Sequence, residues 1–121
     1  MTTQTAVYQT HLPLPDRRQD KVRDVYRVER SHEPDQVLVI ATDRISAFDV
    51  IMPTPIPGKG RLLTEVSLNW FKFIRELDLV QDHLISTDPA DVPGISDADR
   101  EMIEGRMMLC RMAEVVPIEC V

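Results

Sequence analysis

The chain has 121 residues, of which 43% are hydrophobic and 28% charged, the size and composition of one small globular domain. Its net charge of −6 disfavours a nucleic-acid-binding protein, because such proteins neutralise phosphates with clustered Lys and Arg. No apolar run reaches the roughly 20 residues that span a bilayer, and residues 1–15 lack the pattern of a signal peptide, so we expect a cytoplasmic protein without membrane contacts.

The first third of the chain predicts an extended arm followed by a β-hairpin. Residues 1–20 are mostly polar and contain prolines, as in an extended arm. Residues 21–28 (KVRDVYRV) alternate and are rich in β-branched residues, which predicts a strand. A turn is expected at 31–35, and the apolar run 36–42 (QVLVIAT) predicts a strand buried on both faces or nearly so.

The middle of the chain predicts a long helix. Three prolines exclude a helix from residues 51–60. After them, apolar residues recur at helical spacing and form one face. These residues are Leu62, Leu63, Val66, Trp70, Phe73, Ile74 and Leu77.

The last third predicts a loop over 78–95, a short helix and two strands. Ser96 is a typical N-cap, and Gly105 is expected to end the helix. Residues 106–113 and 115–121 have the composition of strands, and the cysteines in them predict buried, reduced thiols. The fold class is therefore α+β, with a mainly antiparallel sheet and helices between its strands.

Two stretches near the predicted hairpin can carry chemistry. Lys21 and Arg23 alternate along a strand, so both side chains can reach one polyphosphate; an exposed strand face with salt bridges explains them as well. Residues 42–49 (TDRISAFD) follow a buried strand and can orient a substrate. The alternative is a hydrogen-bonded turn in which Asp43 pairs with Arg44.

Two further stretches are weaker candidates. Residues 57–61 (PGKGR) precede the long helix, whose N-terminus can bind an anion, although the spacing is not that of a P-loop. Residues 114–120 (EVVPIEC) can present backbone groups to a flat ligand such as adenine, or form a plain edge strand. No Cys/His cluster has metal-ligand spacing, so no metal site is expected in this chain.

The order of these motifs resembles one family. KVRDVY, ATDRISAFDVIMPTPIPGKGRLLTEVSLNWF and GRMMLCRMAEVVPIECV, from Lys21 to Val121, are similar to the N-terminal part of SAICAR synthetases, the phosphoribosylaminoimidazole-succinocarboxamide synthases. The resemblance implies a ligase of purine biosynthesis that joins L-aspartate to carboxyaminoimidazole ribonucleotide (CAIR), using ATP and Mg²⁺. It also implies a small lobe over residues 21–121, like the N-terminal lobe of kinases, with ATP between it and a larger C-terminal lobe.

The same resemblance suggests roles for individual residues. The positions matching ATP-binding residues are Lys21, Arg23, Arg111, Glu114, Val115 and Val116. The positions matching substrate-binding residues are Ser46, Ala47, Asp49 and Glu119. Metal ligands are expected in the C-terminal part of the family chain. Where the family usually has Gly, this chain has Asp20, which adds a negative charge near the expected polyphosphate.

Two hypotheses follow for the protein as a whole. The chain stops within the apolar run 115–121, which predicts the N-terminal lobe of a larger ligase, inactive by itself. The alternative is a non-catalytic nucleotide-binding or regulatory module derived from that lobe, which Asp20 favours.

Overall fold

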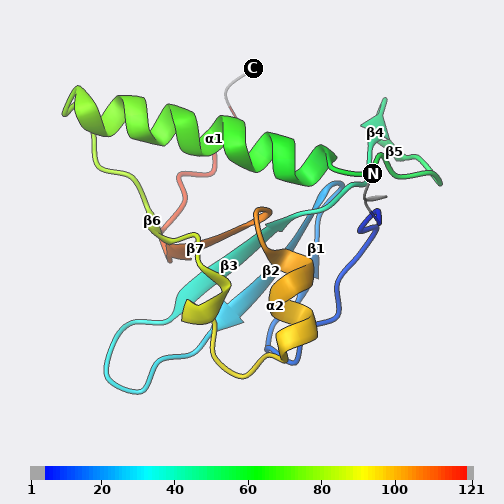
Figure 1. The fold of residues 1–121 in the computed structure, drawn as a ribbon. Coiled ribbons are helices and arrows are strands. Elements are labelled where there is room, and N and C mark those ends of the chain that lie inside the picture. Colours follow the sequence, from blue (N-terminus) through cyan, green and yellow to red (C-terminus); the bar gives the residue numbers. More distant parts are fainter. Residues whose placement is uncertain (1–4, 120–121) are drawn as a thin grey trace.

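The β2–β3 hairpin is the centre of a five-stranded antiparallel sheet in the computed structural model, which describes residues 5–119 (Figure 1). The strand order is β1-β2-β3-β7-β6. The strands are β1 (Arg18–Gln19), β2 (Arg23–Val28), β3 (Gln36–Ala41), β6 (Leu84–Ser86) and β7 (Met107–Arg111). Two helices and a short 3₁₀ helix pack on this sheet, which confirms the predicted α+β class.

One face of the sheet is fully buried and the other only partly. Along β2 and β3 buried residues alternate with partly buried or exposed ones, as period 2 requires. None of residues 36–42 is exposed, which agrees with the expected strand buried on both faces or nearly so, but the two faces differ: Leu38 and Ile40 are buried, whereas Val37 and Val39 are partly buried. The reason is that the helices cover one face of β3 more completely than the other.

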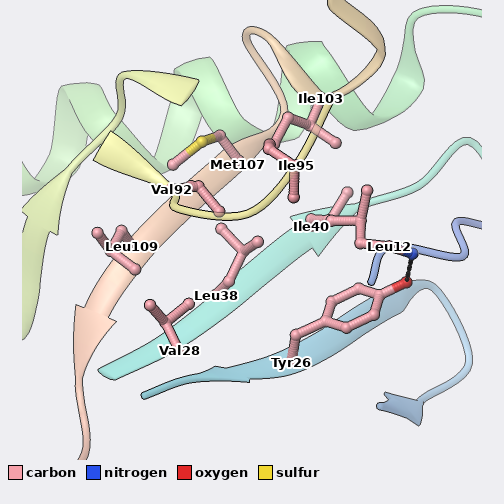
Figure 2. Packing of buried hydrophobic residues seen from close by; sticks show 10 residues of the cluster. All are labelled: Leu12, Tyr26, Val28, Leu38, Ile40, Val92, Ile95, Ile103, Met107 and Leu109. Atoms are coloured by element: carbon pink, nitrogen blue, oxygen red, sulfur yellow. Dashed lines mark hydrogen bonds between the residues drawn. The ribbon is translucent and has the colours of Figure 1, made fainter. Parts of the chain in front are cut away.

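The hydrophobic core lies between the buried sheet face and the segment from η1 (Pro89–Asp91) through α2 (Asp97–Ile103) (Figure 2). Its members are Leu12, Tyr26, Val28, Leu38, Ile40, Val92, Ile95, Ile103, Met107 and Leu109. Leu12 comes from residues 1–20, and the prediction of an extended arm there was wrong, because this segment packs on the sheet and contributes β1. The Leu12 N–H donates to the Tyr26 hydroxyl at 3.1 Å.

The predicted helices are both present. The first, α1 (Lys59–Glu76), begins earlier than expected, because Pro57 is the last proline and Gly58 takes a left-handed conformation (φ 84°) just before the helix. Helix α2 has the expected cap: the Ser96 hydroxyl accepts from the Asp99 N–H, and the Asp99 carboxylate accepts from the Ser96 N–H. No helix within residues 5–119 is long and apolar enough to cross a membrane.

Two predictions for the last third were wrong. Residues 78–95 are not all loop, since they include β6, which adds an edge strand to β7, and η1, which Asp88 caps. Residues 115–119 form no strand and their apolar side chains are exposed, because no described strand lies beside them. β7 confirms most of the 106–113 strand; its Cys110 is a free, buried thiol, as predicted, whereas Cys120 lies outside the described residues.

Two buried ion pairs lie at the end of β3. Asp43 accepts from Arg106 Nη1 at 2.9 Å, and Arg44 donates to Asp24 Oδ1, also at 2.9 Å. All four side chains are at most 2% exposed. The alternative in which Asp43 pairs with Arg44 is contradicted: β3 lies between β2 and β7, and Asp43 and Arg44 turn to opposite neighbours.

The Asp43 carboxylate also fixes the start of α1. It accepts the Gly60 N–H at 2.8 Å and the Val7 N–H at 2.8 Å. Gly60 lies directly on β3: a Cβ there would collide with the Ala41 carbonyl and lie 2.7 Å from Arg106 Nη1. The glycine is thus required by close helix–strand packing.

We predict that Gly60→Ala destabilises the domain by about 2 kcal/mol or more, as an overpacked site does, although alanine normally favours a helix. Urea unfolding measures the effect. Gly94→Ala is the matched control: it introduces only the strain of a positive φ (77°), because no atom lies within 4 Å of the place that its methyl group would take. A Gly60→Ala domain as stable as the unaltered one would contradict this packing.

Acid should destabilise the domain in part through Asp43. Burial alone would raise the pKa of this carboxyl, but hydrogen bonds from Arg106, Val7 and Gly60 outweigh it and hold the pKa below its ordinary 3.8. The unfolded chain therefore takes up the proton first as pH falls. The contribution of Asp43 to stability is present above that ordinary value and is lost as pH falls through the folded-state pKa.

We accordingly expect the unfolding free energy of Asp43→Asn to fall less than that of the unaltered chain as the pH is lowered from about 5 to below 3.8. Chemical denaturation at a series of pH values measures this slope. Glu65→Gln is the control, because Glu65 is exposed on α1 and takes part in none of the ion pairs described within residues 5–119. Equal slopes for Asp43→Asn and the unaltered chain would contradict the role given to Asp43.

Candidate functional site

Residues 20–23 form a turn at the start of β2 that carries two cations, and we call it the cationic turn. Lys21 Nζ contacts the Asp49 carboxylate. Arg23 donates to Asp20 Oδ2 from Nε at 3.1 Å and from Nη2 at 2.9 Å. The Lys21 and Arg23 side chains are more than half exposed, so both predicted phosphate-binding cations face outward.

The Asp20 carboxylate is an oxyanion bound by this turn. It accepts the Val22 N–H at 3.1 Å in addition to the two bonds from Arg23. Burial by itself would raise the pKa of Asp20, but the Val22 N–H and the Arg23 guanidinium lower it below its usual value. A backbone N–H together with a guanidinium is the donor set that proteins use for phosphate.

A short hairpin lies beside the cationic turn. It consists of β4 (Ser46–Ala47) and β5 (Val50–Ile51). Phe48 and Asp49 between them both have positive φ, 51° and 64°, in a position where Asn-Gly is usual. Such a conformation costs about 1 kcal/mol or more for each residue and recurs at functional sites.

The Lys21–Asp49 ion pair connects this hairpin to the cationic turn. The hydrogen bond and charge of Lys21 hold the pKa of Asp49 below its ordinary value. Three predicted site residues, Lys21, Arg23 and Asp49, are thereby brought into one place, with Ser46 and Ala47 on the adjoining strand.

The partly buried face of the sheet is apolar next to the cationic turn. Val25, Val39 and Met108 lie opposite one another across β2, β3 and β7, and all three are partly buried. Further along, Val37 and Met112 line a cavity of about 30 Å³ on the same part of the sheet. A flat aromatic base can pack on such a surface.

The remaining predicted residues lie at the other end of the sheet. Arg23 is opposite Ala41, and Arg111 is opposite Gln36, five positions away along β3. At about 3.4 Å per residue this separates them by about 17 Å. Arg111 lines a polar cavity of about 320 Å³ with Arg75 and Asp82.

The chain after β7 carries the other predicted nucleotide contacts. Glu114, Val115 and Val116 follow in an exposed stretch that is neither helix nor strand, and Glu119 is exposed at the end of the described residues. The structure therefore does not bring these residues or Arg111 next to Lys21.

Two donors of the PGKGR stretch at the start of α1 are already engaged within the domain. The Gly60 N–H is taken by Asp43, and Lys59 Nζ donates to the Arg44 carbonyl at 2.7 Å. Among residues 5–119, no three His, Cys, Asp or Glu side chains are grouped as a metal site requires.

Sequence reasoning did not identify the buried Arg44 beneath the cationic turn. It donates to the Lys21 carbonyl at 3.1 Å and to the Asp20 carbonyl at 3.0 Å. The available signal was a charged pair, Asp43-Arg44, directly after a buried strand, where an unpaired charge is costly.

Known proteins similar to this chain are SAICAR synthetases. The family model described as SAICAR synthetase matches residues 17–121. A phosphoribosylaminoimidazole-succinocarboxamide synthase of Desulfosudis oleivorans is 47% identical over 116 residues, which are 95% of this chain and 37% of the relative. The synthase of Thermodesulfovibrio yellowstonii is 45% identical over 104 residues, 86% of this chain and 33% of the relative.

Solved structures agree with these matches. A chain described as SAICAR synthase superposes with a TM-score of 0.71 at 34% identity, covering 93% of this chain and 39% of that one. The SAICAR synthase from Saccharomyces cerevisiae, complexed with SAICAR, gives a TM-score of 0.69 at 35% identity, covering 93% of this chain and 38% of that one. The chain thus spans about a third to two fifths of the length of the relatives it matches. Since both sequence and fold match over nearly the whole chain, it belongs to the SAICAR synthetase family and corresponds to the N-terminal part of that enzyme.

Proposed function

We propose that this chain is the ATP-binding lobe of a cytoplasmic ligase that joins L-aspartate to CAIR and forms SAICAR. The observation that carries the proposal is the cationic turn, in which the Val22 N–H and the Arg23 guanidinium already bind one oxyanion, the Asp20 carboxylate. A triphosphate presents the same kind of oxygen to the same donors. Family membership supplies the reaction, since the similar proteins are named for it.

The arrangement of the sheet suggests how ATP would lie. Its phosphates would meet Lys21 and Arg23, and its base would lie toward Arg111 and the Glu114–Val116 stretch, at the other end of the sheet. The apolar, partly buried face with Val25 and Val39 connects the two ends. This order matches ATP itself, whose base and phosphates lie at opposite ends of the molecule.

CAIR would bind beside the hairpin that carries Ser46, Ala47 and Asp49, with Glu119 as a further contact. Bound ATP supplies the phosphoryl group that activates a carboxylate for attack by the aspartate amine. The residues of this chain would hold the triphosphate and orient it toward the hairpin, because Lys21 lies between the two. We place the ligands of Mg²⁺ in the part of the family chain that these residues do not span.

A second candidate function is a non-catalytic nucleotide-binding or regulatory module. Asp20 favours it, since a carboxylate fills the donors that a phosphate would use and repels a polyanion. Fusing residues 1–121 to the remaining residues of the Desulfosudis oleivorans relative distinguishes the two. ATP-, CAIR- and aspartate-dependent SAICAR formation by the fusion, with none by residues 1–121 alone, supports the ligase lobe; ATP binding without turnover by the fusion supports the module.

Lys21→Ala in this fusion should raise the apparent KM for ATP by about tenfold and leave the KM for aspartate unchanged, because charged hydrogen bonds to phosphate are worth about 1.5–3 kcal/mol. Steady-state kinetics with each substrate varied in turn measure both constants. Lys72→Ala, which removes an exposed cation from α1, is the control and should change neither. A Lys21→Ala enzyme altered only toward aspartate or CAIR would refute the assignment.

Replacing Asp20 should strengthen ATP binding. Two unit charges about 4 Å apart in water repel by about 1 kcal/mol, so Asp20→Gly is expected to lower the Kd for ATP by about fivefold and also to free the Val22 N–H. Asp20→Asn removes the charge but keeps a side chain that can accept this N–H, and should give a smaller gain. Calorimetric titration measures the Kd for ATP of the unaltered, Asp20→Gly and Asp20→Asn chains. Unchanged or weaker ATP binding by Asp20→Gly would count against a phosphate site at this turn.

A further inference from the structure

The cationic turn is held from beneath by the residues that follow β3. The Arg44 guanidinium, fully buried, donates to the carbonyls of Asp20 at 3.0 Å and Lys21 at 3.1 Å, and to that of Arg23 at 3.2 Å. Thr42 binds the one carbonyl between them: its hydroxyl and its N–H donate to the Val22 oxygen at 2.7 and 3.0 Å. Four successive carbonyls of the turn thus accept hydrogen bonds from two buried residues.

This arrangement gives the turn two chemically different sides. The carbonyl oxygens meet the buried Arg44 and Thr42, whereas the Lys21 and Arg23 side chains are exposed and meet carboxylates. Carbonyl oxygens close to a polyphosphate would repel it. Drawing all four to the inner side leaves N–H and cationic donors for the outer side.

We propose that Arg44 is a positioning residue for phosphate binding: it does not touch the nucleotide but shapes the turn that does. This inference rests on the proposed function. Asp24 holds the guanidinium in place with its own carboxylate at 2.9 Å. A planar guanidinium can serve several carbonyls and a carboxylate at once, whereas a lysine ammonium has three donors on one atom and cannot span the turn.

Arg106 provides a matched control within the same domain. It too is a buried arginine paired with a buried aspartate at 2.9 Å. Its other hydrogen bond goes to the Ala41 carbonyl, and none is made to residues 20–23. Replacing Arg106 by lysine therefore perturbs an equivalent ion pair without removing support from the cationic turn.

The test compares the chains Arg44→Lys, Arg106→Lys and Thr42→Val with the unaltered 121-residue chain. Amide hydrogen exchange followed by NMR, without nucleotide, reports local opening of residues 20–23 relative to β2 and β3. We expect Arg44→Lys to speed exchange in the turn by about tenfold beyond any change elsewhere, as loss of buried hydrogen bonds does. Arg106→Lys should change exchange near α1 and leave the turn as it was.

Titration with Mg·ATP is the second measurement, and it uses the same variants in the fusion with the remaining residues of the Desulfosudis oleivorans relative, because we place the Mg²⁺ ligands there. Arg44→Lys should raise the Kd by about tenfold, Thr42→Val by a smaller factor, and Arg106→Lys should bind as the unaltered chain does. If Arg44→Lys does not fold, Thr42→Val decides the outcome, because it removes a single hydroxyl with little change of shape.

Two results would overturn the inference. The first is that Arg44→Lys and Arg106→Lys change hydrogen exchange in the turn and the Kd for ATP equally. The second applies if Arg44→Lys does not fold: it is a Thr42→Val chain with the exchange rates and Kd of the unaltered one. A fusion with unaltered residues 1–121 that binds no ATP would instead refute the proposed function, and with it the phosphate role of Arg44. The exchange data would still show whether Arg44 shapes the turn.

Discussion

The two ion pairs at the end of β3 are the constraint on which the rest of the domain depends. β3 is the central strand, so its last residues lie between the starts of β2 and β7. Asp43 joins Arg106 and the first turn of α1, and Arg44 joins Asp24 and the cationic turn. Removing one member of such a pair strands a buried charge, which costs about 3–5 kcal/mol. One dipeptide therefore ties together the sheet, a helix and the candidate site.

Buried and exposed charges have different tasks in this domain. The buried pairs fix the backbone, because Asp43 accepts the Gly60 N–H and Arg44 donates to the carbonyls of the cationic turn. The exposed pairs, Lys21–Asp49 and Asp20–Arg23, lie in water, where an ion pair contributes at most about 1 kcal/mol. A triphosphate can displace such weak internal partners at little cost. A site for a charged ligand requires a rigid backbone and surface ion pairs that the ligand can replace.

The apolar residues of α1 show how periodicity can predict an element without predicting its environment. Leu62, Val66 and Trp70 recur at helical spacing and correctly indicate a helix, yet they are 46–60% exposed. The residues of α1 that are buried are Gly60 and Thr64. The helix approaches β3 through its smallest side chains, because the backbones come too close for larger ones.

The sequence by itself determined the hairpin, both helices, the α2 cap and the family, since each depends on residues close together in the chain or on motif order. It also placed Lys21 and Arg23 together, because period 2 sets their spacing. It did not predict the partners of Asp43 and Arg44, or the strand β6. It wrongly extended a strand through Val115 and Val116. Those features depend on which strands become neighbours, and only the tertiary structure decided which strands do. The reason is that an ion pair or an edge strand forms between segments that lie from 20 to 60 or more residues apart in the chain.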